Sequence, residues 1–150
     1  MSIERAARAL LVSVPEIAER TKTSNGTYRV RPNALSQFDK PALPGIVIYE
    51  IDSPSEEHLG GGAGLAHTRL QFDCIADTEA EARRLRELVR LKLQGFRGTV
   101  VLKDVSVEIT GTTIAGRRSE FDPPSDGSDV GSHVASIDVI FSHREPVAIG

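Results

Sequence analysis

The sequence predicts an α+β fold with a small, mostly antiparallel sheet and helices packed on one of its faces. Three observations lead to this prediction: two segments with helical periodicity, several segments that alternate as half-buried strands do, and the order in which they occur. That order is helix, strands, helix, strands, with strand neighbours close enough in sequence to form hairpins. At 150 residues, the chain has the length of one domain, so we expect a single domain over residues 1–150.

The composition is that of an ordinary soluble globular chain, with 39% apolar and 26% charged residues and no Trp. The net charge of -3 argues against a dedicated nucleic-acid binder, although net charge does not describe how charge is distributed. No apolar run approaches the roughly 20 residues that a membrane span needs, and the N-terminus lacks the apolar core of a signal peptide. The single cysteine, Cys74, excludes an internal disulfide framework and suits a reducing compartment.

A first helix is expected over residues 2–14, where apolar residues fall on one side. Pro15 should end or kink it, because proline clashes with the preceding turn. Ser13 is a candidate cap for a second, short helical piece over residues 15–20, and a turn follows at 21–27.

The best helix in the sequence is expected over residues 78–95. Thr78 is its candidate N-cap, and Glu81 lies three residues later to complete a capping box. Gly95 supplies the stop. One apolar stripe runs along this helix and must pack on something; it consists of Ala82, Leu85, Leu88, Val89 and Leu93.

Strands are expected where side chains alternate or form a short apolar run. A short extended segment at 28–32 carries Arg29 and Arg31 between apolar residues. The nearly continuous apolar run at 46–51 is typical of a buried strand. Alternation predicts further strands over residues 67–76, 100–110 and 134–142, the last with Ser136 and Asp138 facing outward.

Two long polar segments separate these strands. The glycine-rich segment 52–67 is most simply the tip of an extended β-hairpin, and 116–132 is expected to be a second loop. Loops of this length in a small domain tend to be functional or disordered. We therefore expect the two loops to be used against partners.

No motif favours catalysis or a cofactor, and we expect neither. The glycines at 60–64 lack the Lys-Ser/Thr and the helix of a phosphate loop. A metal site built from Glu56, Glu57, His58 and His67 is less favoured than a solvated acidic loop, because nothing fixes its geometry.

The remaining reactive side chains have structural explanations as well. We interpret Cys74 as a small, buried hydrophobic residue rather than a nucleophile. A triad of His133, His143 and Asp138 has little support without a nucleophile elbow. The basic residues of the 78–95 helix either form a soluble face balanced by glutamates, which is favoured, or dock an acidic partner; they are Arg83, Arg84, Arg86, Arg90 and Lys92.

The succession of these segments resembles the tail terminator (tail completion) proteins of long-tailed bacteriophages and of phage-derived gene transfer agents. The most telling part is the strand, Asp-Thr-x-x-Glu-Ala and helix succession that ends in Leu-x-Gly. The matching residues are the N-terminal helix, 29–32, 44–49, 70–76, 77–82, 93–95, 121–123 and 126–127.

This resemblance implies a non-enzymatic virion protein that forms a ring, usually hexameric, at the head-proximal end of the tail tube. The ring ends tube polymerisation and presents a surface to the connector (head completion) protein. The implied partners are other copies of the chain, the tail tube protein and the connector, with DNA passing through the lumen without specific binding. The protein would be assembled in the cytoplasm of the host bacterium.

Two site hypotheses follow from the resemblance. Acidic residues on or near the hairpin would face the channel or the tube; they are Glu50, Asp52, Glu56 and Glu57. Residues 122–131, with Asp122 and Asp126, would contact a neighbour or the connector.

Two other functions stay open at the level of sequence. The first is a cytosolic α+β module that binds a small ligand or a protein. The second, weaker one is a hydrolase that uses His58 or His67.

Overall fold

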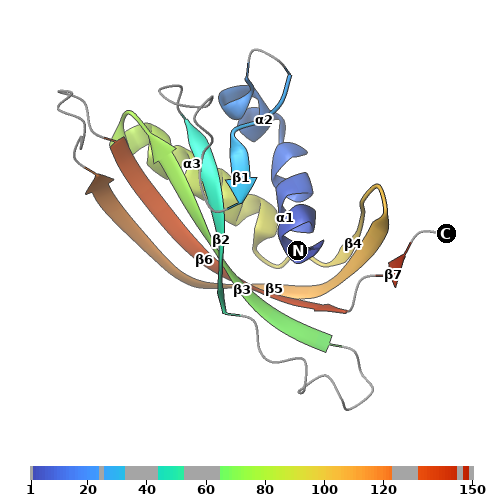
Figure 1. Ribbon diagram of the computed structural model, residues 1–150. Helices are drawn as coiled ribbons and strands as arrows, with labels where there is room; N and C mark the ends of the chain where they lie inside the picture. Colours follow the sequence, from blue (N-terminus) through green and yellow to red (C-terminus); the bar gives the residue numbers. More distant parts are fainter. Residues whose placement is uncertain are drawn as a thin grey trace.

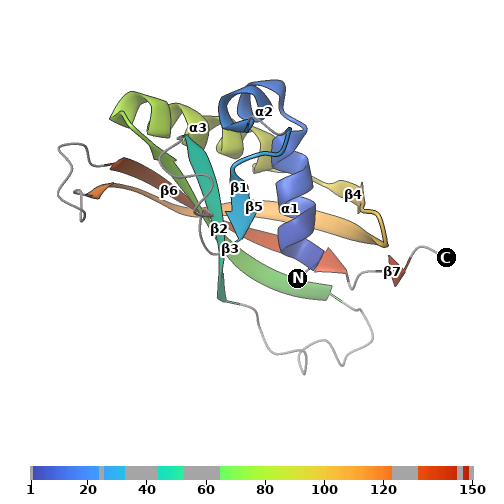
Figure 2. The ribbon, with the colours of Figure 1, turned by 45° about the horizontal axis from the view of Figure 1, so that its top comes forward.

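The computed structural model describes residues 2–23, 26–32, 44–52, 65–122, 132–144 and 147–148. These residues form one curved sheet with three helices over one of its faces (Figures 1 and 2). The helices are α1 (Ser2–Val12), α2 (Pro15–Thr21) and α3 (Glu79–Leu93). The strands are β1 (Val30–Pro32), β2 (Gly45–Asp52), β3 (Leu65–Ala76), β4 (Gly98–Val101), β5 (Val105–Asp122), β6 (Ser132–Arg144) and β7 (Val147–Ala148).

The order of strands across the sheet is β1-β2-β3-β6-β5-β4, and β7 pairs with the start of β5. Every described strand pair is antiparallel except β1 with β2. The predicted α+β class with a mostly antiparallel sheet and helices on one face is therefore confirmed. β6 comes late in the chain but lies in the middle of the sheet, between β3 and β5.

Helix α3 forms as its local signals predict. The Thr78 side chain accepts a hydrogen bond from the backbone N–H of Glu81 at 3.2 Å, and Gly95 follows the helix with φ +72°. The Glu81 carboxylate does not complete a capping box with Thr78; it lies 3.5 Å from a guanidinium nitrogen of Arg20 on α2. The whole predicted apolar stripe of α3 is buried.

The proposed role of Ser13 as the cap of the second helix is wrong. The N-cap residue of α2 is Val14, whose side chain makes no capping hydrogen bond. The Ser13 hydroxyl instead donates to the carbonyl of Leu10 at 2.5 Å, because the last turn of α1 offers it a nearer acceptor. Pro15 does end the first helix and begins α2.

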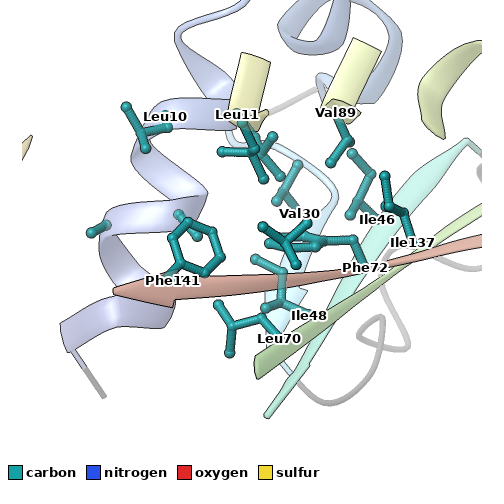
Figure 3. Close-up of a cluster of buried hydrophobic side chains, with 14 of the residues drawn as sticks. Leu10, Leu11, Val30, Ile46, Ile48, Leu70, Phe72, Val89, Ile137 and Phe141 are labelled. Carbon is teal, nitrogen blue, oxygen red and sulfur yellow. The ribbon is translucent and has the colours of Figure 1, made fainter. Parts of the chain in front are cut away.

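The core lies between the helices and the inner face of the sheet. Alternate residues of β3 and β6 point into it, and the rings of Phe72 and Phe141 lie 6.3 Å apart at 57°. Figure 3 shows labelled side chains from α1, α3, β1, β2, β3 and β6 meeting in this layer. Cys74 is buried there, as predicted, and burial raises the pKa of its thiol.

Two predicted strand boundaries are wrong. The segment 100–110 is not one strand, because a turn at 102–104 divides it into β4 and β5, closed by the Leu102 N–H donating to the Val105 carbonyl at 2.8 Å. Residues 116–122 are not loop, because β5 continues to Asp122 and pairs there with β6. β5 shifts register twice on the way, between Ile109 and Gly111 and between Ile114 and Gly116, which marks two bulges.

The predicted buried run at 46–51 is buried only in part, since Ile51 is 49% exposed. β1 lies beside β2 only as far as Ile48, so the end of β2 lies at the margin of the sheet. The antiparallel pairing of β2 with β3 agrees with the predicted hairpin, while its tip, 53–64, lies outside the described residues.

Arg29 is a buried arginine whose partners the sequence does not reveal. Its side chain is 8% exposed and donates to three backbone carbonyls: Pro44 at 2.7 Å, Lys22 at 3.1 Å and Arg20 at 3.1 Å. These carbonyls belong to the end of α2, the following turn and the residue before β2. One guanidinium group thus connects three separate backbone segments through hydrogen bonds.

Helices α2 and α3 are linked by Glu16, and this link gives a prediction for the pH dependence of stability. Arg84 donates to both carboxylate oxygens of Glu16, at 2.7 and 2.9 Å, and Arg20 donates at 3.0 Å. These hydrogen bonds lower the pKa of Glu16 from 4.5 to about 2, and the bonds from Arg84 have the largest effect. A lowered pKa in the folded state stabilises the fold above the unfolded pKa of 4.5, and this contribution is lost as pH falls through about 2.

We therefore expect Glu16→Gln to lower the melting temperature at neutral pH. As the pH falls from 4.5 to about 2, the melting temperature of this variant should fall less than that of the wild type. Thermal melts across this acid range would measure both effects. Glu19→Gln, on the exposed side of the same helix, is the control and should leave the profile unchanged. Parallel wild-type and Glu16→Gln profiles would contradict the prediction.

Candidate assembly surface

The face of the sheet that the helices do not cover carries a polar network. The Asp73 carboxylate accepts from the Gln71 side-chain amide and from the Ser136 hydroxyl, each at 2.7 Å, and Arg118 donates to the side-chain amide oxygen of Gln71 at 2.6 Å. Ser136 was expected to face outward; it does lie on this face, but it is only 3% exposed because long neighbouring side chains enclose it. The network joins β3, β6 and β5.

Asp138 is the buried charge of this network. Its carboxylate accepts from Arg69 at 2.7 Å and lies 3.8 Å from Arg118, and the residue is 3% exposed. Asp138 faces outward, as predicted, but two arginines pair with its carboxylate and compensate its burial, so it is enclosed rather than exposed. This arrangement fixes neighbouring strands against each other rather than leaving a carboxylate free for catalysis.

The histidines of the described chain are engaged within the sheet. His143 is hydrogen-bonded to Thr68 at 2.9 Å, and burial lowers the pKa of its imidazole. His67 is exposed and bonded to Ser142 at 2.9 Å. Asp138 is paired with Arg69 and Arg118, so the structure does not bring it together with His143 as a triad would require.

The less favoured metal site cannot be tested at three of its four residues, because Glu56, Glu57 and His58 lie outside the described residues. Within the described part of the chain, no group of three or more His, Cys, Asp or Glu side chains could hold a metal ion. None of the described helices has the length and apolar character needed to cross a membrane.

The basic residues of α3 divide into two sets. Most are paired along the surface of the helix bundle: Arg83 with Glu79 at 2.6 Å, Arg90 with Glu87, and Arg84 with Glu16. This agrees with the favoured interpretation of a balanced soluble face.

Arg86 behaves differently from these residues. It reaches across to β5, where it donates to the backbone carbonyl of Arg118 at 2.9 Å and to the Ser119 hydroxyl at 3.1 Å. This side chain therefore links α3, which packs over β6 and β3, to β5.

A shallow hollow marks part of this junction. It is lined by Glu87, Arg90 and Gln94 of α3 and by Ile114 and Arg117 of β5. Arg117 and Arg118 were missed by the sequence analysis, because residues 116–122 were expected to be loop. The adjacent arginines after the alternating residues of β5 were the one signal that could have identified them.

The predicted acidic residues lie elsewhere. Glu50 is half-buried on β2. Burial raises the pKa of Glu4 on α1, and the nearby charge of Glu50 raises it further. Asp52 is the last residue of β2, and Asp122 is the last residue of β5. Because β2 and β5 run in opposite directions with two strands between them, these ends lie far apart; Asp126 is outside the described residues.

Comparison with known proteins gives a likeness of fold. No protein-family model matches the sequence, and no curated protein matches it. Among solved structures, the fold is similar to that of a chain from the "Virion of native gene transfer agent (GTA) particle", with a TM-score of 0.58 and 18% sequence identity. The match covers 97% of this chain and 94% of that chain, so it extends over nearly all of both folds.

Proposed function

We propose that this chain is a structural protein of a phage or gene transfer agent virion, and specifically a tail terminator. In this role, several copies, usually six, form a ring at the head-proximal end of the tail tube. The ring ends tube polymerisation and offers its other side to the connector protein of the head.

The observation that carries this proposal is the likeness to a gene transfer agent virion chain over 97% of this sequence and 94% of that one. A likeness that extends over nearly the whole of both chains favours a shared structural role over a shared fragment. The motif positions agree with it: the Asp-Thr-x-x-Glu-Ala sequence is the junction at which β3 ends and Thr78 caps α3, and Gly95 ends α3.

The two lateral borders of the sheet give independent support, because they differ. One border carries β1 and the end of β2, and the other carries β4 and the part of β5 with which β4 does not pair. A closed ring needs two different, complementary side surfaces on each subunit, whereas a symmetric dimer needs only one.

The acidic residues have a place in this proposal. Glu50, Asp52, Glu56 and Glu57 remain candidates for a subunit interface or for the wall of the channel, where negative charge would let DNA pass without phosphate contacts. Asp122 and Asp126 remain candidates for contact with a neighbour or with the connector.

Native mass spectrometry of the purified protein over a range of concentrations tests the ring directly. We expect a species at a whole multiple, six or close to it, of the 16.2 kDa subunit, growing with concentration. Added to tail tube protein during polymerisation, the chain should shorten the tubes and appear at one end in electron micrographs. Monomer at every concentration, together with unchanged tube lengths, would refute the proposal.

A further inference from the structure

Strand β4 is the last strand on its side of the sheet, and its outer edge is unpaired among the described strands. Figure 1 shows β4 and β5 as a hairpin at this end of the sheet. The Leu102 N–H donates to the Val105 carbonyl, so residues 98, 100 and 102 turn their backbone groups toward β5. The backbone groups of Thr99 and Val101 therefore point away from the sheet, where an added strand can pair with them.

The side chains at this edge are exposed as well. Val101 is 71% exposed, more than the other exposed large hydrophobic residues of the described chain, and Thr99 is exposed beside it. Val100, between them, is buried in the core. Thr99 and Val101 thus lie on the sheet face that the helices leave uncovered, and branched side chains of this kind favour a strand neighbour.

Strand β1, at the opposite border, is closed to an added strand. The Ile46 N–H donates to the Arg29 carbonyl at 2.8 Å, so the backbone groups of Val30 and Pro32 point outward. The Val30 carbonyl already accepts from Nε of Arg8 at 2.8 Å, and proline has no N–H to donate. β4 has no such protection within the described residues, so the two borders differ.

Positive charge without a partner flanks the edge of β4. Arg97 precedes the strand and Lys103 lies in the turn after it; both are exposed, and neither forms an ion pair within the described residues. The acidic residues nearby are already paired: Asp104 with Arg5 and Glu108 with Arg144. The charge that this edge offers to a partner is therefore positive.

We propose that the outer edge of β4 binds an extended acidic segment of another protein, which adds to the sheet as a further strand. Thr99 and Val101 exchange backbone hydrogen bonds with this segment, and one of its apolar side chains covers Val101. Its acidic residues, on both sides of the apolar one, face Arg97 and Lys103. This site goes beyond the proposed ring and does not depend on it, since one subunit carries the whole edge.

A second copy of β4 is a less suitable occupant. In the antiparallel register that uses both outward residues of each copy, Thr99 of one copy lies opposite Val101 of the other. Arg97 then lies opposite Lys103 of the other copy, and like charges directly opposite each other destabilise a strand pair. The charges of this edge therefore disfavour self-pairing and favour an acidic partner.

Binding of a labelled synthetic peptide, followed by fluorescence anisotropy, tests the site. The probe is Glu-Asp-Val-Thr-Val-Asp-Glu, with protein added up to about 1 mM so that weak complexes are included. We expect saturable binding that weakens as salt is added, because the flanking charges are exposed. The same peptide with lysine at its acidic positions should not bind, and neither should one methylated on its central backbone amides.

Variants of β4 separate backbone pairing from charge. Val101→Pro removes the outward N–H and leaves the bonds to β5 in place, so it should weaken binding about tenfold or more. Val101→Thr keeps that N–H and the branched shape; as the matched control it should bind within about threefold of wild type. Circular dichroism melts show whether each variant is folded.

The charge is tested in the same assay. Lys103→Glu should weaken binding about tenfold or more, because it places a negative charge beside an acidic peptide. Lys22→Glu makes an equal change at an exposed position after α2 and should leave binding unchanged.

Three results would overturn the inference. The first is no saturable binding, or equal binding of the lysine peptide. The second is self-association of Lys103→Glu with no peptide bound to wild type, since the cations would then only keep β4 edges apart. The third is loss of wild-type rings in Val101→Pro without peptide binding, which would make a second copy the occupant. Failure of wild-type protein to form rings would refute the proposed function and leave this site standing.

Discussion

Replacing Arg29 with alanine is expected to lower the free energy of unfolding by about 4 kcal/mol. The side chain is buried and satisfies the carbonyls of Pro44, Lys22 and Arg20, so its removal leaves three acceptors without their donor. The cavity left by the long side chain adds to the loss. Urea denaturation at a concentration where the protein is monomeric measures the effect.

Arg29→Lys should recover little of this stability, because one ammonium cannot reproduce the planar fork that reaches three separate carbonyls. Arg97→Ala, at an exposed position, is the matched control and should change stability by about 0.5 kcal/mol or less. An Arg29→Ala variant as stable as the control would show that these bonds contribute nothing.

Phe72→Ala is expected to cost about 3 to 5 kcal/mol, as for other large-to-small changes in a packed core. Phe72 is fully buried on the central strand β3 and packs against Phe141 of β6. Its removal opens a cavity beneath the helices, and the strands on both sides limit collapse into it. Phe72→Leu keeps most of the volume and should cost less than half as much.

The same denaturation experiment separates the two core variants. Equal losses for alanine and leucine would mean that the aromatic contact, rather than cavity volume, decides the cost. No loss for alanine would contradict the packing described for this layer.

Helix α3 and strand β3 could be predicted from sequence because their signals are local. The Thr78 cap, the apolar stripe and Gly95 all act within a few residues of each other. β3 alternates because one face meets the core and the other does not. The α+β class followed from such elements and their order.

The end of β5 could not be predicted, because the usual signal is absent there. Residues 116–119 are glycine, two arginines and serine, and a strand at the border of a sheet need not alternate in hydrophobicity. Arg117 and Arg118 were missed for this reason. Glu50 and Asp52 were named, but the unpaired edge of residues 49–52 depends on where β1 stops, which only the register reveals.

The burial of Arg29 and of Asp138 could not be predicted for another reason. Their burial depends on partners far away in the sequence: the Pro44 carbonyl for Arg29, and Arg69 and Arg118 for Asp138. From sequence alone, a charged residue in an alternating segment is predicted to be exposed unless such partners are known.

The position of β6 has a consequence for how the chain reaches its fold. Residues 132–144 fill the middle of the sheet, yet they leave the ribosome after both of their neighbours, β3 and β5. Until they emerge, β3 and β5 have no partner between them, and the nascent protein exposes two long strands that invite wrong pairing. The sheet therefore cannot close until β6 has been synthesised, and the many pairings between distant segments should make folding slow.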